Sequence, residues 1–238
     1  MGRAFEYRKE RKMKRWANMA KTFTKIGREI AIAVREGGGD PNYNARLRLA
    51  VQNAKVANMP KANVENAIKK ALSKDAESFD EVVYEGYAPH GIAVIVETAT
   101  NNTNRTVANI RHIFSKYGGS LGTSGSVEFM FERKAVFKIK SSERNPEELE
   151  LELIDFGLDE MKHEDDLLVL YSKFEDFGSL QKALEERGIE ADSSELVRIP
   201  THTKELNDEQ AEEVIKLIEK MEEDEDVINI FHNMDMGE

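Results

Sequence analysis

The chain has 238 residues and contains no cysteine, 40% hydrophobic residues and 33% charged residues. This length predicts two or three compact units. The lack of cysteine excludes a disulfide framework, a thiolate zinc site and a cysteine nucleophile. No apolar run approaches the roughly 18 residues that span a bilayer, and the charged N-terminus lacks an apolar signal core. We therefore expect a soluble, cytoplasmic protein with no membrane partner.

Charge divides the chain into two contrasting parts. Residues 1–76 contain 18 Lys and Arg against 7 Asp and Glu, a balance of +11, whereas the remainder contains 16 against 38, a balance of −22. Such asymmetry is typical of a protein that contacts nucleic acid through its basic end. The alternative is that the basic part docks on the acidic parts of the same chain, and both interpretations can hold together.

The first predicted helix follows from an apolar stripe between residues 16 and 34. Its members recur at steps of three and four: Trp16, Met19, Phe23, Ile26, Ile30 and Val34. Four basic residues fall on the opposite face and are expected to point outward: Lys14, Lys21, Lys25 and Arg28. Residues 1–13 do not keep this pattern, so they are predicted to form a basic arm outside the helix.

Two further helices are predicted before residue 76. Three glycines at 37–39 end the first helix, after which Asp40 is expected to be an N-cap and Pro41 a first helical residue. Pro60 is expected to open the third helix. The predicted inward positions are Leu47, Val51 and Ala54 in the second helix, and Val64, Ile68 and Leu72 in the third.

The pattern changes to short β-branched segments near Phe79. Segments 82–87 and 91–98 predict a hairpin, Asn102 or Thr103 is expected to cap a helix, and alternation over 126–131 predicts a strand. Next comes a complete βαββαβ order, with strands at 135–140, 158–163, 167–171 and 194–199 and helices at 146–156 and 176–187. A helix at 207–222 and a strand at 227–232 follow.

The simplest arrangement of these elements is an insertion. We predict an α+β, multi-domain protein with a basic helical domain (1–76), a discontinuous α/β domain (77–131 and 205–238) and an inserted βαββαβ domain (132–204). Both α/β domains are expected to be ferredoxin-like.

The basic surface is the main chemical signal, because Lys and Arg neutralise phosphates and release counterions without reading bases. The predicted contacts are Lys14, Arg15, Lys21, Lys25, Arg28, Arg46, Arg48, Lys55 and Lys61. Arg105 joins them, because the polar segment 100–106 opens a helix whose N-terminus suits phosphate; a simple capping loop is the alternative. Trp16 and Tyr43 are candidates for stacking on bases, although the position of Trp16 on the apolar stripe favours a core role.

Other motifs point away from catalysis. The glycine-rich segment 118–126 is followed by no Lys-Ser/Thr pair and is therefore not a Walker A loop. The histidines have no metal-ligand spacing. Glu85 and Glu97 are conceivable as an acid–base pair, but nothing favours them over other strand residues. We expect no enzyme, no cofactor, no metal and no small-molecule substrate.

Several long strings resemble the YebC family of probable transcriptional regulatory proteins, whose mitochondrial relatives are translational activators of cytochrome c oxidase subunit I. They include RWANMAK (15–21), GGGDPNYNARLRLA (37–50), YEGYAPHGIAVIVE (84–97), TNNTNRTVANIRHIFSK (100–116) and GGSLGTSGSVEFMF (118–131). The opening residues before Arg15 depart from the commoner family start, so no residue role is carried over there.

The resemblance implies a helical first domain and two α/β domains, the third inserted in the second. It also implies a non-enzymatic, nucleic-acid-binding regulator of gene expression whose partner is DNA. The alternatives are a ribosome-associated translation activator that contacts ribosomal RNA or tRNA, and a protein-interaction scaffold with a basic docking domain. Ribosomal or transcription proteins are further expected partners.

Overall fold

The computed structural model describes the backbone of residues 3–141 and 145–235, and the side chains of residues 19–141 and 145–235. The chain forms two compact units. Unit 1 comprises Met1–Val82, Thr98–Thr103 and Glu222–Ile228, and unit 2 comprises Val83–Glu97, Asn104–Met221 and Asn229–Glu238. Two short segments from later in the chain join unit 1, and the second of them, Glu222–Ile228, is acidic.

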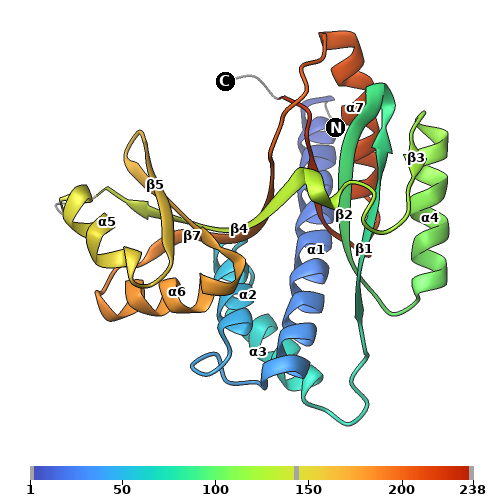
Figure 1. Ribbon diagram of the computed structural model, residues 1–238. Coiled ribbons are helices and arrows are strands. Elements are labelled where there is room, and N and C mark those ends of the chain that lie inside the picture. The colour runs from blue at the N-terminus through green and yellow to red at the C-terminus, as the bar shows by residue number, and fades with distance from the viewer. Residues whose placement is uncertain (1–2, 142–144, 236–238) are drawn as a thin grey trace. The chain divides into compact units, whose positions relative to one another are not determined.

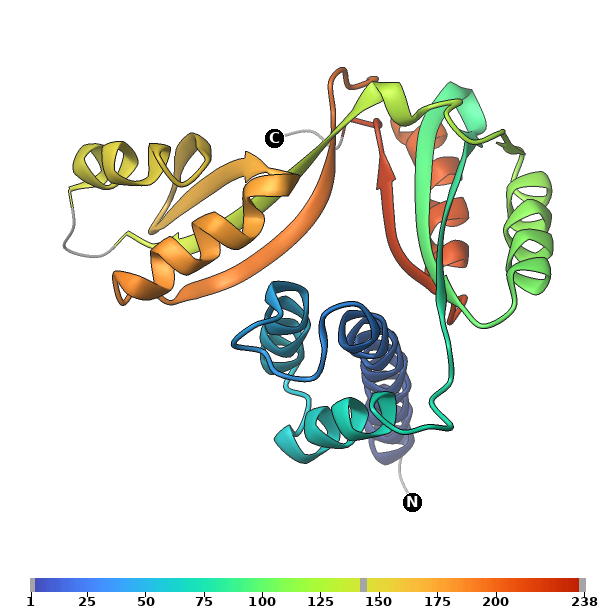
Figure 2. The same ribbon diagram turned by 60° about the horizontal axis from the view of Figure 1, so that its bottom comes forward.

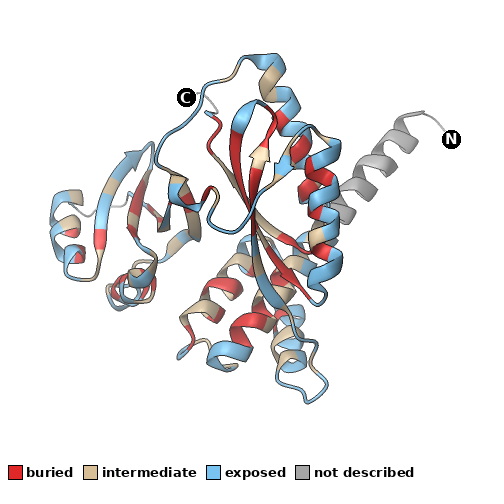
Figure 3. Ribbon diagram, turned by 45° about the vertical axis from the view of Figure 1, so that its right-hand side comes forward, coloured by how far each residue is buried: buried red, intermediate tan, exposed pale blue. Residues whose placement is uncertain are grey.

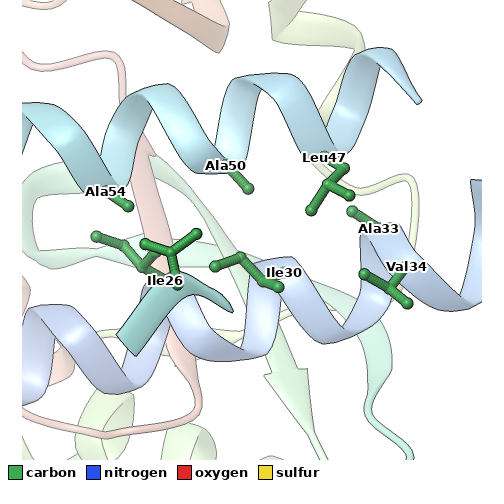
Figure 4. Close-up of a cluster of buried hydrophobic side chains, with 8 residues drawn as sticks. Ile26, Ile30, Ala33, Val34, Leu47, Ala50 and Ala54 are labelled. Carbon is green, nitrogen blue, oxygen red and sulfur yellow. The ribbon is translucent and has the colours of Figure 1, made fainter. Parts of the chain in front are cut away.

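Three helices dominate unit 1: α1 (Arg3–Gly37), α2 (Ala45–Val56) and α3 (Lys61–Ala71) (Figure 1). The predicted stripe of α1 is confirmed for Ile26, Ile30 and Val34, which are buried in one apolar cluster. Leu47, Ala50 and Ala54 of α2 face them, as Figure 4 shows. Because these residues recur at helical spacing on both helices, they bring the two apolar stripes into contact.

Three local expectations for unit 1 are wrong. The helix α1 begins at Arg3, so the segment predicted to be a separate arm continues the helix. The N-cap of α2 is Asn44 rather than Asp40, because residues 41–43 form a turn before the helix begins. Leu72 is the C-cap of α3 and is 61% exposed, since the helix ends at Ala71 before this side chain can turn inward.

The first sheet has the strand order β3-β1-β2-β8. Its strands are β1 (Asp80–Ala88), β2 (Ile92–Thr100), β3 (Ser120–Leu121) and β8 (Val227–His232). The predicted hairpin of β1 and β2 is confirmed, and a 3₁₀ turn, η1 (Pro89–Gly91), connects these two strands. Helices α4 (Thr103–Lys116) and α7 (Asp208–Glu222) accompany this sheet.

The strand predicted over residues 126–131 is wrong. Residues Glu128–Met130 form the 3₁₀ turn η2, and β4 begins only at Phe131. The alternating apolar residues of this segment do not line one buried face, because Val127 is buried whereas Phe129 is 75% exposed. The backbone N–H groups of Val127 and Glu128 donate to the side-chain carboxylate of Glu85 and are therefore not available to a sheet.

The second sheet has the order β5-β6-β4-β7 and is antiparallel. Its strands are β4 (Phe131–Lys140), β5 (Leu158–Glu164), β6 (Leu167–Lys173) and β7 (Ala191–Pro200), and its helices are α5 (Pro146–Ile154) and α6 (Phe177–Glu186). A third 3₁₀ turn, η3 (Phe174–Asp176), precedes α6. Phe137 of β4 stacks on Phe177 of α6 at 5.2 Å between ring centroids. This is the predicted βαββαβ order.

The predicted fold class is confirmed: a helical N-terminal region precedes two antiparallel four-stranded sheets, each with two helices. The domain boundaries stated above stay a prediction. Among the described residues, no helix is long and apolar enough to cross a membrane.

Candidate nucleic-acid interface

Arg28 is held by acidic and carbonyl groups within unit 1. Its Nη1 donates to the carboxylate of Asp226 at 2.6 Å and to the carbonyl oxygens of Glu225 and Ala99 at 2.7 and 3.0 Å. The Arg28 side chain is 13% exposed and that of Asp226 is 3% exposed. The outward orientation predicted for Arg28 is therefore wrong, because the acidic segment 222–228 covers this part of α1.

Lys25 is engaged by the same acidic segment. Its Nζ donates to the carbonyl oxygen of Glu222 at 3.3 Å. Burial is the main influence on this ammonium and lowers the pKa of Lys25 below its ordinary value, with nearby Lys21 acting in the same direction. Lys21 itself is half-buried. The alternative in which the basic part docks on acidic parts of its own chain thus describes this side of α1.

The two arginines of α2 also have partners within unit 1. Arg46 forms ion pairs with Glu36, at 2.8 Å, and with Glu81. Arg48 donates from Nη1 to the carbonyl oxygens of Pro41 and Asn42 at 3.0 and 3.1 Å. Arg48 therefore braces the loop between α1 and α2.

A group of exposed lysines remains on α2, on α3 and just after α3. We call them the α2–α3 lysines: Lys55, Lys61, Lys69, Lys70 and Lys74. Lys61 approaches Glu65 of its own helix at 3.7 Å, an exposed pair of small energetic value. Lys69, Lys70 and Lys74 were not among the predicted contacts, although all three are exposed.

The loop before α2 presents an exposed aromatic ring in the same unit as these lysines. Tyr43 is 88% exposed. Its neighbours are fixed: Asp40 accepts the N–H of Asn42 at 2.9 Å, and Asn44 is a buried N-cap. A methyl group added at Gly39 would lie 2.8 Å from the side chain of Leu72, which shows that the loop contacts the end of α3.

The remaining predicted contacts are dispersed. The side chains of Lys14 and Arg15, and that of Trp16, lie outside the described residues. Arg105 is exposed on α4, in unit 2.

The carboxylate considered as a candidate acid or base in unit 2, that of Glu85, organises a loop instead. It accepts the backbone N–H groups of Gly125, Val127 and Glu128 at 2.6, 2.8 and 2.8 Å. Burial acts to raise the pKa of Glu85, but these donors and the positive charge of Arg198 outweigh it and leave the pKa below its ordinary value. The sequence held no local signal for this, because the acceptor and its donors are about 40 positions apart.

The second carboxylate considered, Glu97, is held by Arg198 at 2.8 Å and by the amide of Asn229 at 3.2 Å. No hydrogen bond joins it to Glu85 among the described residues. In the part of the chain with described side chains, no group of His, Asp or Glu is arranged to hold a metal ion.

Fold and site together define an α+β protein with a cationic three-helix module followed by two antiparallel sheets. The chain belongs to the TACO1/YebC family: residues 3–74 match the model of the TACO1/YebC protein N-terminal domain, and residues 79–234 match that of the TACO1/YebC second and third domain.

Relatives and one solved structure agree with this assignment. Proteins from Porphyromonas gingivalis and Parabacteroides distasonis, each named probable transcriptional regulatory protein, are 60% identical over 235 residues, 98% of this chain and 97% of theirs. The crystal structure of a conserved hypothetical protein from Aquifex aeolicus is 39% identical, has a TM-score of 0.78, and covers 92% of this chain and 91% of its own.

Proposed function

We propose that the chain is a non-enzymatic regulator of gene expression that binds the phosphate backbone of nucleic acid through the α2–α3 lysines. The observation that carries the proposal is the exposure of all five lysines, whereas Arg28 and Arg46 of unit 1 are ion-paired with acidic side chains. Phosphate contacts of this kind supply affinity and position without sequence information. The names of the relatives favour DNA as the partner and transcription as the process.

The proposal revises the predicted set of contacts. Arg28 is ion-paired with Asp226, and Arg46 is ion-paired with Glu36 and Glu81. Neither arginine can bind phosphate without first breaking these ion pairs. Lys55 and Lys61 stay in the set. They are joined by the exposed lysines at the end of α3, namely Lys69, Lys70 and Lys74.

A salt titration tests this proposal. Binding of a fluorescent 20-base-pair duplex DNA is measured by anisotropy over a KCl series for the wild type and for K61A/K69A/K70A. Each lost phosphate contact removes about 0.9 from the slope of log K against log salt, so three contacts remove about 2.7. The matched control, K162A/K182A/K216A, makes the same charge change on exposed lysines of unit 2. An unchanged slope for the α3 variant contradicts the proposal.

The second candidate is a translation activator that contacts ribosomal RNA or tRNA. Tyr43 favours it, because an exposed aromatic ring suits the unpaired bases of folded RNA. Sedimentation of tagged protein from lysate through a sucrose gradient separates the two candidates. Co-migration with ribosomal particles that is lost at high salt favours translation, and migration as free protein favours DNA. Co-migration of the tagged protein with an acidic protein, and with no nucleic acid, would favour the scaffold alternative.

A further inference from the structure

A second basic region interrupts the acidic part of the chain. Residues 98–127 contain no Asp or Glu, although 38 acidic residues lie elsewhere after residue 76. The same stretch contains Arg105, Arg111 and Lys116, all of them on α4. This stretch therefore has a balance of +3 within a part of the chain whose balance is −22.

The helix α4 divides into a buried side and an exposed side. Thr106, Ile110 and Phe114 are fully buried, and Ile113 is 9% exposed. Figure 3 shows exposed and buried residues alternating along α4, as expected for a helix with one side on a sheet. The basic residues lie on the exposed side because the apolar ones occupy the other.

Helical spacing orders the exposed side into two rows. Arg105, Asn109, His112 and Lys116 are related by steps of four, three and four, which align side chains along one edge of a helix. Asn104, Arg111 and Ser115 form the neighbouring row at steps of seven and four. All seven are exposed, and the residue between the rows, Ala108, is exposed and small enough to let a backbone approach closely.

Three carboxylates near this stretch are held by partners of unit 2. Glu85 is buried and saturated by three backbone N–H donors. Glu97 and Glu128 are both paired with Arg198. The carboxylates at either end of the acid-free stretch thus share one arginine, whereas Arg111 and Lys116 remain exposed, Lys116 over the ring of Tyr117.

From this arrangement we propose that the exposed side of α4 is a second surface for the phosphodiester backbone of nucleic acid, in addition to the α2–α3 lysines. The proposal rests on nucleic-acid binding as the function of the chain. Charge complementarity selects the ligand, because phosphate carries one charge per nucleotide and the face offers cations and amide donors without a carboxylate. Two separate surfaces on one chain raise overall affinity by multivalency.

The test uses full-length R111A/K116A and the anisotropy assay with a KCl series. Two lost contacts remove about 1.8 from the salt slope on duplex DNA and about 1.4 on single strands, so DNA duplex, RNA duplex and single-stranded RNA probes form separate arms. Both substitutions are exposed and alanine favours the helix, so folding is retained. The matched control is K182A/K216A, which removes two exposed lysines from α6 and α7.

The outcomes separate this inference from the proposed function. A reduced slope for R111A/K116A in at least one arm, with the control unchanged, supports the α4 surface, and the arm that responds identifies the nucleic acid. An unchanged slope in all arms, while K61A/K69A/K70A reduces it, overturns the α4 surface alone. If R111A/K116A reduces the slope and K61A/K69A/K70A does not, the proposed role of the α2–α3 lysines is overturned and α4 is the binding surface. A wild type that binds none of the probes overturns both.

Discussion

The carboxylate of Glu85 is the acceptor around which residues 125–128 fold. Replacing it with glutamine leaves one acceptor oxygen and turns an N–H₂ group toward backbone donors that it cannot satisfy. A buried donor without a partner costs about 1–3 kcal/mol. We therefore expect E85Q to lower the free energy of unfolding by about this amount in urea titrations at pH 7. The control E195Q, on an exposed residue of β7, should change it by less than about 0.5 kcal/mol.

The same group predicts how stability depends on pH. The pKa of Glu85 in the folded protein is below its unfolded value of about 4.3. Its contribution is therefore fully present above the unfolded pKa and is lost as the pH falls through the folded pKa. We expect the stability difference between wild type and E85Q to be constant from about pH 7 to pH 5 and to shrink below about pH 4. A difference that grows on acidification would contradict the assigned role.

At Tyr43 the expected effect is on binding rather than on stability. The ring is 88% exposed, so its removal loses few internal contacts. If it stacks on a base, Y43A should weaken binding of a single-stranded RNA by at least about fivefold, the lower limit of about 1 kcal/mol per stacked base. The salt slope should not change, because no charge is removed. Y43F keeps the ring and should bind like the wild type; equal affinities of Y43A and Y43F would exclude stacking.

Single residues differ in how far a sequence predicts them. Ile26, Ile30 and Val34 were predictable because helical periodicity is a local signal. Glu85 was not, because its environment is built by a distant loop that has no periodic pattern.

Among the elements, α2 depends on one side chain more than on its composition. Oδ1 of Asn44 accepts the N–H of Leu47 at 3.0 Å, and its Nδ2 donates to the carbonyl oxygens of Ala33 and Gly38 at 2.7 and 2.8 Å. The residue caps α2 and also ties it to the end of α1. Loss of an N-cap alone costs about 0.5–2 kcal/mol.

We expect N44A to lower the free energy of unfolding by about 2 kcal/mol, from the cap and the two further bonds. N44D should be no better, although Asp is ordinarily as good an N-cap as Asn, because a carboxylate would face two carbonyl oxygens. Urea unfolding followed by circular dichroism at 222 nm measures both variants. D40A should cost less than either, since Asp40 is exposed; recovery of stability in N44D would show that only the cap matters.

Asp40 and Asn44 illustrate the limit of prediction at the scale of an element. Both residue types cap helices, and Pro41 favoured a start at Asp40. Asn44 is the N-cap because its amide also donates to carbonyl groups at the end of α1, which lie within reach only when the two helices are packed together. The strand predicted at residues 126–131 failed for a related reason, since Glu85 takes up the N–H groups that a ladder would need.

At the scale of the whole molecule, the partition of charge has two consequences that the sequence did not separate. Part of the basic surplus binds the acidic segment 222–228, which belongs to unit 1, as Arg28 and Lys25 do. Another part, the α2–α3 lysines, stays exposed. The sum of charges was predictable, but the assignment of each cation was not, because it depends on which acidic segment the fold brings beside α1.

The Arg28–Asp226 pair provides the test at this scale, because it joins residues almost 200 positions apart. R28Q removes the charge and leaves Asp226, with its side chain 3% exposed, as a buried carboxylate without its guanidinium partner, while the hydroxyl of Thr100 still donates to it. Removing one member of a buried ion pair costs about 3–5 kcal/mol. We expect R28Q to lower the free energy of unfolding by about this amount, whereas K21Q, an equal charge change two turns earlier on α1, costs less than about 1 kcal/mol. If Arg28 instead contacts phosphate, R28Q will leave stability unchanged and remove about 0.9 from the salt slope of DNA binding. Measuring unfolding and the salt slope on the same preparations therefore decides whether this arginine maintains the fold or binds the ligand.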